Sequence, residues 1–137
     1  PIGKSNVIHE GNDVTLVSFG KMMKVAEETF NVAKKENISV EVIDLRSVRP
    51  IDYESIVKSV KKTNRLVIIE EAWPLASISS EISHHIQRFA FDYLDAPVHR
   101  ITCEDVPFHY APTLIKEILP SVEKAMKAIK SVTYKKN

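Results

Sequence analysis

Short apolar runs alternate with longer stretches of helical periodicity along most of the chain, and this alternation restricts the fold more than any other feature. Strands are predicted where β-branched and aliphatic residues cluster, over 14–19, 38–45, 65–69 and 97–102. Helices are predicted over 21–36, from Pro50 and Asp52, from about Ser77, and from Pro120. This order predicts one α/β domain, 1–137, with a parallel-dominated sheet between two helical layers.

The composition of the 137 residues argues against several classes of protein. A net charge of +1, from 19 basic and 18 acidic residues, gives no indication of nucleic acid or an anionic membrane as a partner. No apolar run approaches the roughly 20 residues that span a bilayer. Cys103 is the only cysteine, so an internal disulfide is excluded and a reducing compartment is expected. The chain begins with Pro1 instead of methionine, and we expect it to be a fragment of a longer polypeptide.

Glycine is too scarce for a phosphate-binding loop. The three glycines, Gly3, Gly11 and Gly20, are scattered, and there is no G-x-G-x-x-G or Walker sequence. Because such loops need clustered glycines that let backbone amides approach the anion, nucleotide binding by a glycine loop is not expected.

Ligands of open α/β sheets bind at the carboxyl ends of the strands, which draws attention to residues 70–85, EEAWPLASISSEISHH. Glu70 and Glu71 are adjacent, and side chains on a strand alternate between faces, so they are not expected to converge on one substrate atom. His84 and His85 point about 100 degrees apart on a helix and lack the spacing of metal ligands.

Two further candidates for chemistry are also weak. Cys103 is expected to be a buried or half-buried thiol, because free cysteine usually packs as a small hydrophobe. Asp44 ends a predicted strand, but the acidic cluster of a phospho-acceptor domain is missing. The predicted third helix carries an apolar stripe, expected to face inward, of Ile78, Ile82, Ile86 and Phe89. No catalytic, cofactor-binding or metal-binding residue is therefore predicted.

Several segments resemble one family closely and in order along nearly the whole chain. They are HEGNDVT at 9–15, EVIDLRSVRP at 41–50, EEAWP at 70–74, LDAP at 94–97 and DVP at 105–107. They are similar to the C-terminal, transketolase-like domain of the beta subunit of the pyruvate dehydrogenase E1 component. The chain departs from many relatives at Ala72 and at Leu75-Ala76-Ser77, where they have glycines, and at His109.

The resemblance implies a three-layer αβα fold with a five-stranded mixed sheet in which one strand is antiparallel. It implies thiamine-diphosphate- and magnesium-dependent oxidative decarboxylation of pyruvate, followed by reductive acetylation of a lipoyl group on E2. The cofactors would bind the whole enzyme, and not this fragment, because the alpha subunit and the N-terminal, pyrimidine-binding domain of the beta subunit carry the family's motifs. Cytoplasm of bacteria and mitochondrial matrix fit equally well.

The same resemblance implies three partners for this domain: the E1 alpha subunit, a second beta subunit, and the small basic subunit-binding domain of E2. Glu71 and Trp73 are expected at a subunit interface. Asp95 is expected to contact E2, since Pro97 restricts the loop on which it lies. The alternative for Asp95 is a turn cap, and for Trp73 plain core packing.

Two other functions stay open on the sequence alone. The domain could belong to a branched-chain 2-oxo acid or acetoin dehydrogenase. It could also be a stand-alone regulatory α/β domain that binds a small anion.

Overall fold

The computed structural model describes residues 3–71, 77–103 and 119–134. Strands, α-helices (α) and 3₁₀ turns (η) follow one another in the order β1 Asn6–His9, β2 Val14–Ser18, η1 Gly20–Met22, α1 Met23–Lys35, β3 Val40–Asp44, α2 Tyr53–Thr63, β4 Leu66–Ile69, α3 Ile78–Ala90, η2 Phe91–Tyr93, β5 His99–Ile101 and α5 Val122–Val132.

The strands form one five-stranded sheet in the order β1-β3-β2-β4-β5. The pairs β2–β3, β2–β4 and β4–β5 are parallel, and β1 pairs antiparallel with β3. The mostly parallel mixed sheet confirms the predicted fold class. The hydrophobic periodicity of the sequence did not predict β1, because this strand has only four residues and two of them are exposed. The family resemblance did imply one antiparallel strand.

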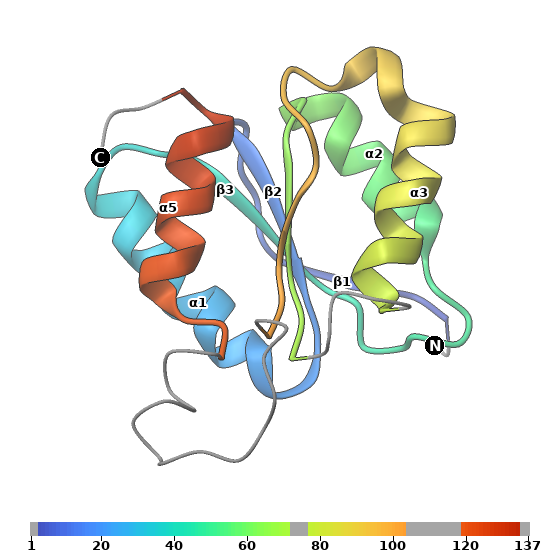
Figure 1. The fold of residues 1–137 in the computed structure, drawn as a ribbon, viewed down its shortest axis with the longest axis horizontal. Coiled ribbons are helices and arrows are strands. Elements are labelled where there is room, and N and C mark those ends of the chain that lie inside the picture. The colour runs from blue at the N-terminus through green and yellow to red at the C-terminus, as the bar shows by residue number, and fades with distance from the viewer. Residues whose placement is uncertain (1–2, 72–76, 104–118, 135–137) are drawn as a thin grey trace.

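Helices cover both faces of the sheet, which gives three layers (Figure 1): α1 and α5 lie on one side, and α2 and α3 on the other. Side chains alternate along each strand, so each face has its own apolar core. Leu16 packs into the α1/α5 core with Ile69 and Ile129. Val17 packs into the α2/α3 core with Ile86.

Side-chain caps fix the starts of three helices. The caps are Asp52, Ser77 and Ser121, and each accepts a hydrogen bond of 3.2 Å from the backbone N–H three residues later. The predicted helix starts near Asp52 and Ser77 are thus confirmed. The last helix begins at Val122 and not at Pro120, because the hydroxyl of Ser121 provides the cap.

One predicted core residue is wrong. Phe89 is 59% exposed, whereas Ala90 is buried. The buried residues of α3 are Ser79, Ile82, Ile86 and Ala90, Ile78 is partly buried, and position 89 is turned about 100 degrees from 90. In the described ranges, no helix is long and apolar enough to cross a membrane.

Candidate functional site

Glu70, just past the end of β4, uses its buried carboxylate to cap the N-terminus of α3. Its Oε1 accepts a hydrogen bond from the backbone N–H of Ile78 at 3.1 Å, and its Oε2 accepts one from Ser79 at 2.9 Å. These amides have no partner within the helix, and the positive end of the helix dipole favours a carboxylate. Glu71 is exposed. The two carboxylates therefore lie in separate environments and do not converge on one point.

The remaining candidates at this end of the sheet are a thiol and an aromatic residue. Cys103 is buried, and burial, together with the charge of Glu71, raises its pKa, while Lys124 opposes the change. A thiol whose thiolate is disfavoured is a poor nucleophile, which agrees with the predicted packing role. Trp73 lies outside the described residues.

The paired histidines on α3 differ as expected. His84 is exposed, whereas the ring of His85 stacks on Tyr53 with centroids 4.0 Å apart and lies 4.6 Å from Phe89. Burial, and then the charges of His84 and Arg88, lower the pKa of His85. Across the part of the chain that the structure describes, no three His, Cys, Asp or Glu side chains gather as a metal-binding group.

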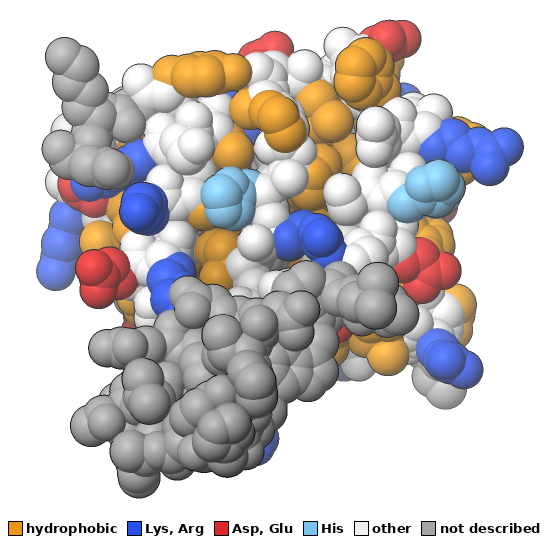
Figure 2. Space-filling view, viewed as in Figure 1, with side chains coloured by type: hydrophobic (Ala, Val, Ile, Leu, Met, Phe, Trp, Pro, Cys, Tyr) orange, Lys and Arg blue, Asp and Glu red, His pale blue; other side chains and the backbone are white. Residues whose placement is uncertain are grey.

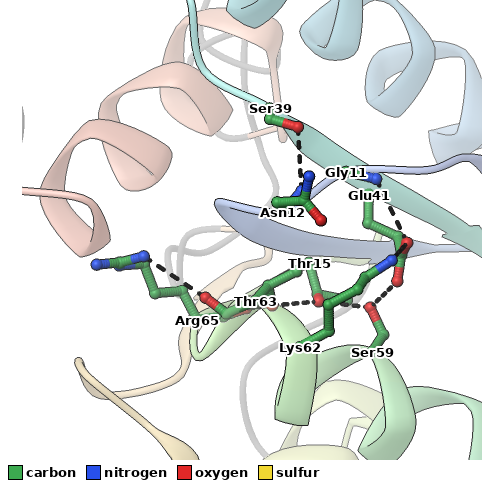
Figure 3. Close-up of polar contacts among 9 residues, drawn as sticks. All are labelled: Gly11, Asn12, Thr15, Ser39, Glu41, Ser59, Lys62, Thr63 and Arg65. Atoms are coloured by element: carbon green, nitrogen blue, oxygen red, sulfur yellow. Dashed lines mark hydrogen bonds and ion pairs between the residues drawn. The ribbon is translucent and has the colours of Figure 1, made fainter.

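A buried polar network lies at the opposite end of the strands, where β2, β3 and β4 begin (Figure 3). Glu41 is only 4% exposed. Its Oε1 accepts hydrogen bonds from the backbone N–H of Gly11, at 3.3 Å, and from Lys62, and its Oε2 accepts one from Ser59. Burial raises the pKa of Glu41, but the bonds from Lys62, Ser59 and Gly11 outweigh burial and lower it overall.

Hydroxyl groups extend this network between β2 and α2. Thr15 Oγ1 lies 2.6 Å from Ser59 Oγ and 2.7 Å from Thr63 Oγ1, and Thr63 donates to the carbonyl oxygen of Arg65 at 3.0 Å. Both oxygens of Glu41 are occupied by protein donors, so this carboxylate is a structural anion and not a general base. Sequence reasoning missed the network, because it joins residues from four separate segments.

Contacts at this same end of the strands explain the glycine in the segment HEGNDVT, residues 9–15. A Cβ on Gly11 would lie 2.3 Å from the carbonyl carbon of Val40, so only glycine fits there. The backbone N–H of Asn12 donates to Ser39 Oγ at 3.0 Å, and the N–H of Ser39 donates to Asp13 Oδ2 at 2.8 Å. The Gly11-Asn12-Asp13 turn thus clamps the start of β3.

Asp95 lies near the same end of the strands, on the turn that leads into β5. Its backbone N–H donates to the carbonyl oxygen of Asn64 at 2.8 Å, and its carbonyl oxygen accepts from the hydroxyl of Tyr134 at 2.7 Å. Its carboxylate is 56% exposed, with Oδ2 3.7 Å from Nη2 of Arg65. The backbone of Asp95 therefore holds the turn, while its charge faces Arg65 and solvent.

Arg65 is a residue that the sequence did not single out. Its Nε donates to the carbonyl oxygen of Val132 at 3.0 Å and its Nη1 to that of Asp13 at 3.1 Å. A cation at the carboxyl end of α5 is favourable to the helix dipole. These contacts hold the guanidinium in place beside Asp95.

Comparisons with known proteins agree on the family. The model of the transketolase C-terminal domain matches residues 3–125. Over 98% of this chain, the beta subunit of the pyruvate dehydrogenase E1 component from Rickettsia bellii is 46% identical, and the mitochondrial one from Dictyostelium discoideum is 47% identical. The chain spans only 41% and 38% of these relatives.

Solved structures show the same fold. A split-gene transketolase, in an inactive beta4 tetramer, superimposes with a TM-score of 0.85 at 27% identity, over 98% of this chain and 43% of that one. A 2-oxoglutarate:ferredoxin oxidoreductase from Magnetococcus marinus gives a TM-score of 0.60 at 14% identity, over 95% of this chain and 19% of that one, and shows the fold alone. With the family model and the sheet order in agreement, the chain belongs to the transketolase C-terminal domain family.

Proposed function

We propose that this chain is the C-terminal domain of the beta subunit of the pyruvate dehydrogenase E1 component. The observation that carries the proposal is the 46–47% identity to such subunits over 98% of the chain. In the assembled enzyme, pyruvate is decarboxylated oxidatively and the acetyl group passes to the lipoyl group of E2. The names of the relatives favour this assignment over a branched-chain or acetoin dehydrogenase and over a stand-alone regulatory domain.

Within that enzyme the domain serves assembly and partner binding. The described residues do not fit a magnesium–diphosphate site, since they lack a cluster of metal-binding side chains. Thiamine diphosphate and magnesium belong to the alpha subunit and to the pyrimidine-binding domain of the beta subunit. The bacterial and mitochondrial names of the relatives fit the cytoplasm of a bacterium or the mitochondrial matrix as the compartment.

The assignment is tested with the full-length beta subunit, co-expressed with its alpha subunit. Pyruvate-dependent acetylation of lipoyl E2 should require both subunits and should exceed turnover of branched-chain 2-oxo acids by a large factor. A preference for a branched-chain acid would overturn the substrate, and full activity of a beta subunit lacking residues 1–137 would overturn the role of the domain.

Glu71 and Trp73 are proposed to lie at a contact with the neighbouring subunit. An exposed carboxylate two positions before an aromatic residue in the sequence suits an interface, where truncation of a buried aromatic costs about 2–4 kcal/mol of association. Trp73→Ala should therefore lower the assembly state in a sedimentation dilution series more than it lowers the melting temperature. Phe89→Ala, which removes an exposed aromatic from α3, is the control. A wild-type assembly state for Trp73→Ala at every dilution would count against the contact.

Asp95 is proposed to bind the basic subunit-binding domain of E2. Its carboxylate is more than half exposed, and the ion pair with Arg65 is long. Asp95→Ala should weaken E2 binding by roughly 1–3 kcal/mol and reduce its salt dependence. The melting temperature should stay near normal, because the backbone bonds of Asp95 survive the change and an exposed ion pair contributes little. The control is Asp92→Ala, which removes a different exposed carboxylate, located in η2. Unchanged affinity beside a lower melting temperature would make Asp95 a turn residue only.

A further inference from the structure

Three ring side chains form a continuous aromatic strip on the surface of α2 and α3: Tyr53, His85 and Phe89. The ring of His85 stacks on that of Tyr53 with centroids 4.0 Å apart, and it lies 4.6 Å from the ring of Phe89. Phe89, at the end of the strip, is 59% exposed. Burial, and then the charge of Glu81 and its hydrogen bond, raise the pKa of Tyr53. These contacts hold the strip in one arrangement before any partner binds.

Polar and charged side chains border the aromatic strip. His84 and Gln87 are exposed on α3, and Cζ of Arg88 lies 5.4 Å from the centroid of the Phe89 ring. On the right of Figure 2, the side that α3 occupies in Figure 1, a histidine, a basic and an acidic side chain are in view together. Exposed apolar groups with a polar border are typical of interaction sites. A strongly basic partner would meet Arg88 first, so the basic domain of E2 does not fit here.

The chain enters the domain beside the start of the aromatic strip. The backbone N–H and the hydroxyl of Ser5 both donate to the carboxylate of Asp52, at 2.9 and 3.0 Å. Asp52 caps α2, and Tyr53 is the first residue of that helix. The N-terminus accordingly lies on the same side of the molecule as α2 and α3 (Figure 1). Any part of the polypeptide that precedes residue 1 therefore arrives next to the strip.

A further exposed apolar side chain lies on the same side of the sheet. Val7 of β1 is 44% exposed and pairs with Ile43, which packs into the α2/α3 core. Directly opposed residues of an antiparallel pair share one face of the sheet, so Val7 lies on the α2/α3 side. Val7 is only two positions after Ser5, close to the point where the upstream chain would arrive.

The relatives have enough additional chain to cover this surface. The 134 matched residues are 41% of the beta subunit from Rickettsia bellii, which leaves more than half of that subunit outside the match. We infer that the N-terminal domain of the full-length beta subunit packs on the aromatic strip and on Val7. The inference rests on the function proposed above and assigns the strip to a contact within one subunit. Because the rings are already stacked, little side-chain freedom is lost when the contact forms.

Hydroxyl-radical footprinting of the wild-type, full-length beta subunit tests this contact, with the subunit free over a dilution series and assembled with its alpha subunit. Phe89 and Phe91 are a matched pair, because they are the same residue type and are 59% and 62% exposed in this domain. In the free subunit at the lowest concentration, Phe89 should be labelled about fivefold more slowly than Phe91, since the core of an interface excludes solvent. Equal labelling in every sample would refute the inference. Protection of Phe89 only at high concentration, or only with the alpha subunit, would assign the strip to another subunit and would also refute it.

Limited proteolysis of the segment before residue 1 measures how firmly the two domains are held together. Phe89→Asp places a charge in the contact, so the domains should separate more often and cleavage should be about tenfold faster. Phe91→Asp is the control and should be cleaved at the wild-type rate. Both positions are exposed in this domain, so neither variant should lower its melting temperature by much. Cleavage of Phe89→Asp at the wild-type rate would contradict the contact.

The activity of the assembled enzyme separates this inference from the proposed function. If Phe89 is labelled like Phe91 while pyruvate-dependent acetylation of E2 is intact, the interdomain contact is refuted and the function stands. If Phe89 is protected in the free subunit while the enzyme prefers a branched-chain acid, the proposed substrate is wrong and the contact stands.

Discussion

Asn in place of Asp52 tests how strongly one buried carboxylate stabilises the domain. Asp52 is 5% exposed and caps α2, and it also ties down the segment before β1. Its Oδ2 accepts hydrogen bonds from Ser55 Oγ at 2.6 Å, from the backbone N–H of Ser5 at 2.9 Å and from Ser5 Oγ at 3.0 Å. Burial raises its pKa, but the bonds from Ser55 and Ser5 outweigh burial and lower the pKa from 3.8 to about 2.

The size of the effect follows from the shift in pKa. A shift of a little under two units, at about 1.4 kcal/mol per unit, makes the ionised form worth about 2 kcal/mol of unfolding free energy at pH 7. Because the pKa is lower in the folded state than in the unfolded chain, this stability is present above about pH 4. It is lost as the pH falls toward 2, with roughly half remaining at pH 3. Asparagine resembles the protonated acid in shape and charge, so Asp52→Asn should lose the same amount.

Urea unfolding of the 137-residue chain and of Asp52→Asn, at pH 7 and at pH 3, measures both quantities. The mutant should be less stable by about 2 kcal/mol at pH 7, and the difference should shrink to about half at pH 3. Asp92→Asn, at an exposed position in η2, should differ little from the wild type at either pH. A pH 7 difference below about 0.5 kcal/mol, or one that is equal at both pH values, would refute the reasoning.

Three other predictions follow from the described geometry. Gly11→Ala should cost about 2–3 kcal/mol in urea unfolding, because the new Cβ would meet backbone atoms of Val40; Gly20→Ala has open space and only its positive φ to strain, so it should cost about 1 kcal/mol. Glu70→Gln should lose about 1–2 kcal/mol with the cap of α3, while the exposed Glu71→Gln stays within about 0.5 kcal/mol of the wild type; equal losses would contradict the capping role. The 137-residue chain should unfold cooperatively by circular dichroism and show no calorimetric binding of thiamine diphosphate with magnesium; micromolar binding would contradict the second expectation.

Local signals made much of the fold predictable from the sequence. Asp52 and Ser77 cap the backbone only three residues away, so their role can be read from a short window. The strands buried on both faces, such as Leu66–Ile69, are continuous apolar runs. The apolar pattern of α3 can continue from Ile86 either three residues on, to Phe89, or four residues on, to Ala90. Both spacings are typical of a helix, so the pattern alone does not show that Ala90 is the buried one.

Contacts between distant segments could not be predicted in the same way. Glu70 caps a helix whose first amides are eight and nine positions later in the chain. The resemblance and the neighbouring Pro97 draw attention to Asp95, but its contacts to Arg65 and Tyr134 bring together residues 30 and 39 positions away in the chain. Such pairings depend on which strands become neighbours, and a single sequence does not specify them.

The separation of the two apolar cores has a consequence for how this domain tolerates substitution. Leu16 and Val17 are neighbours in β2, yet one packs with α1 and α5 and the other with α2 and α3. We therefore expect a change in volume at Leu16 to be compensated within the core that contains Ile129, and one at Val17 within the core that contains Ile86. In related sequences, the two positions should covary with opposite halves of the helical shell and only weakly with each other.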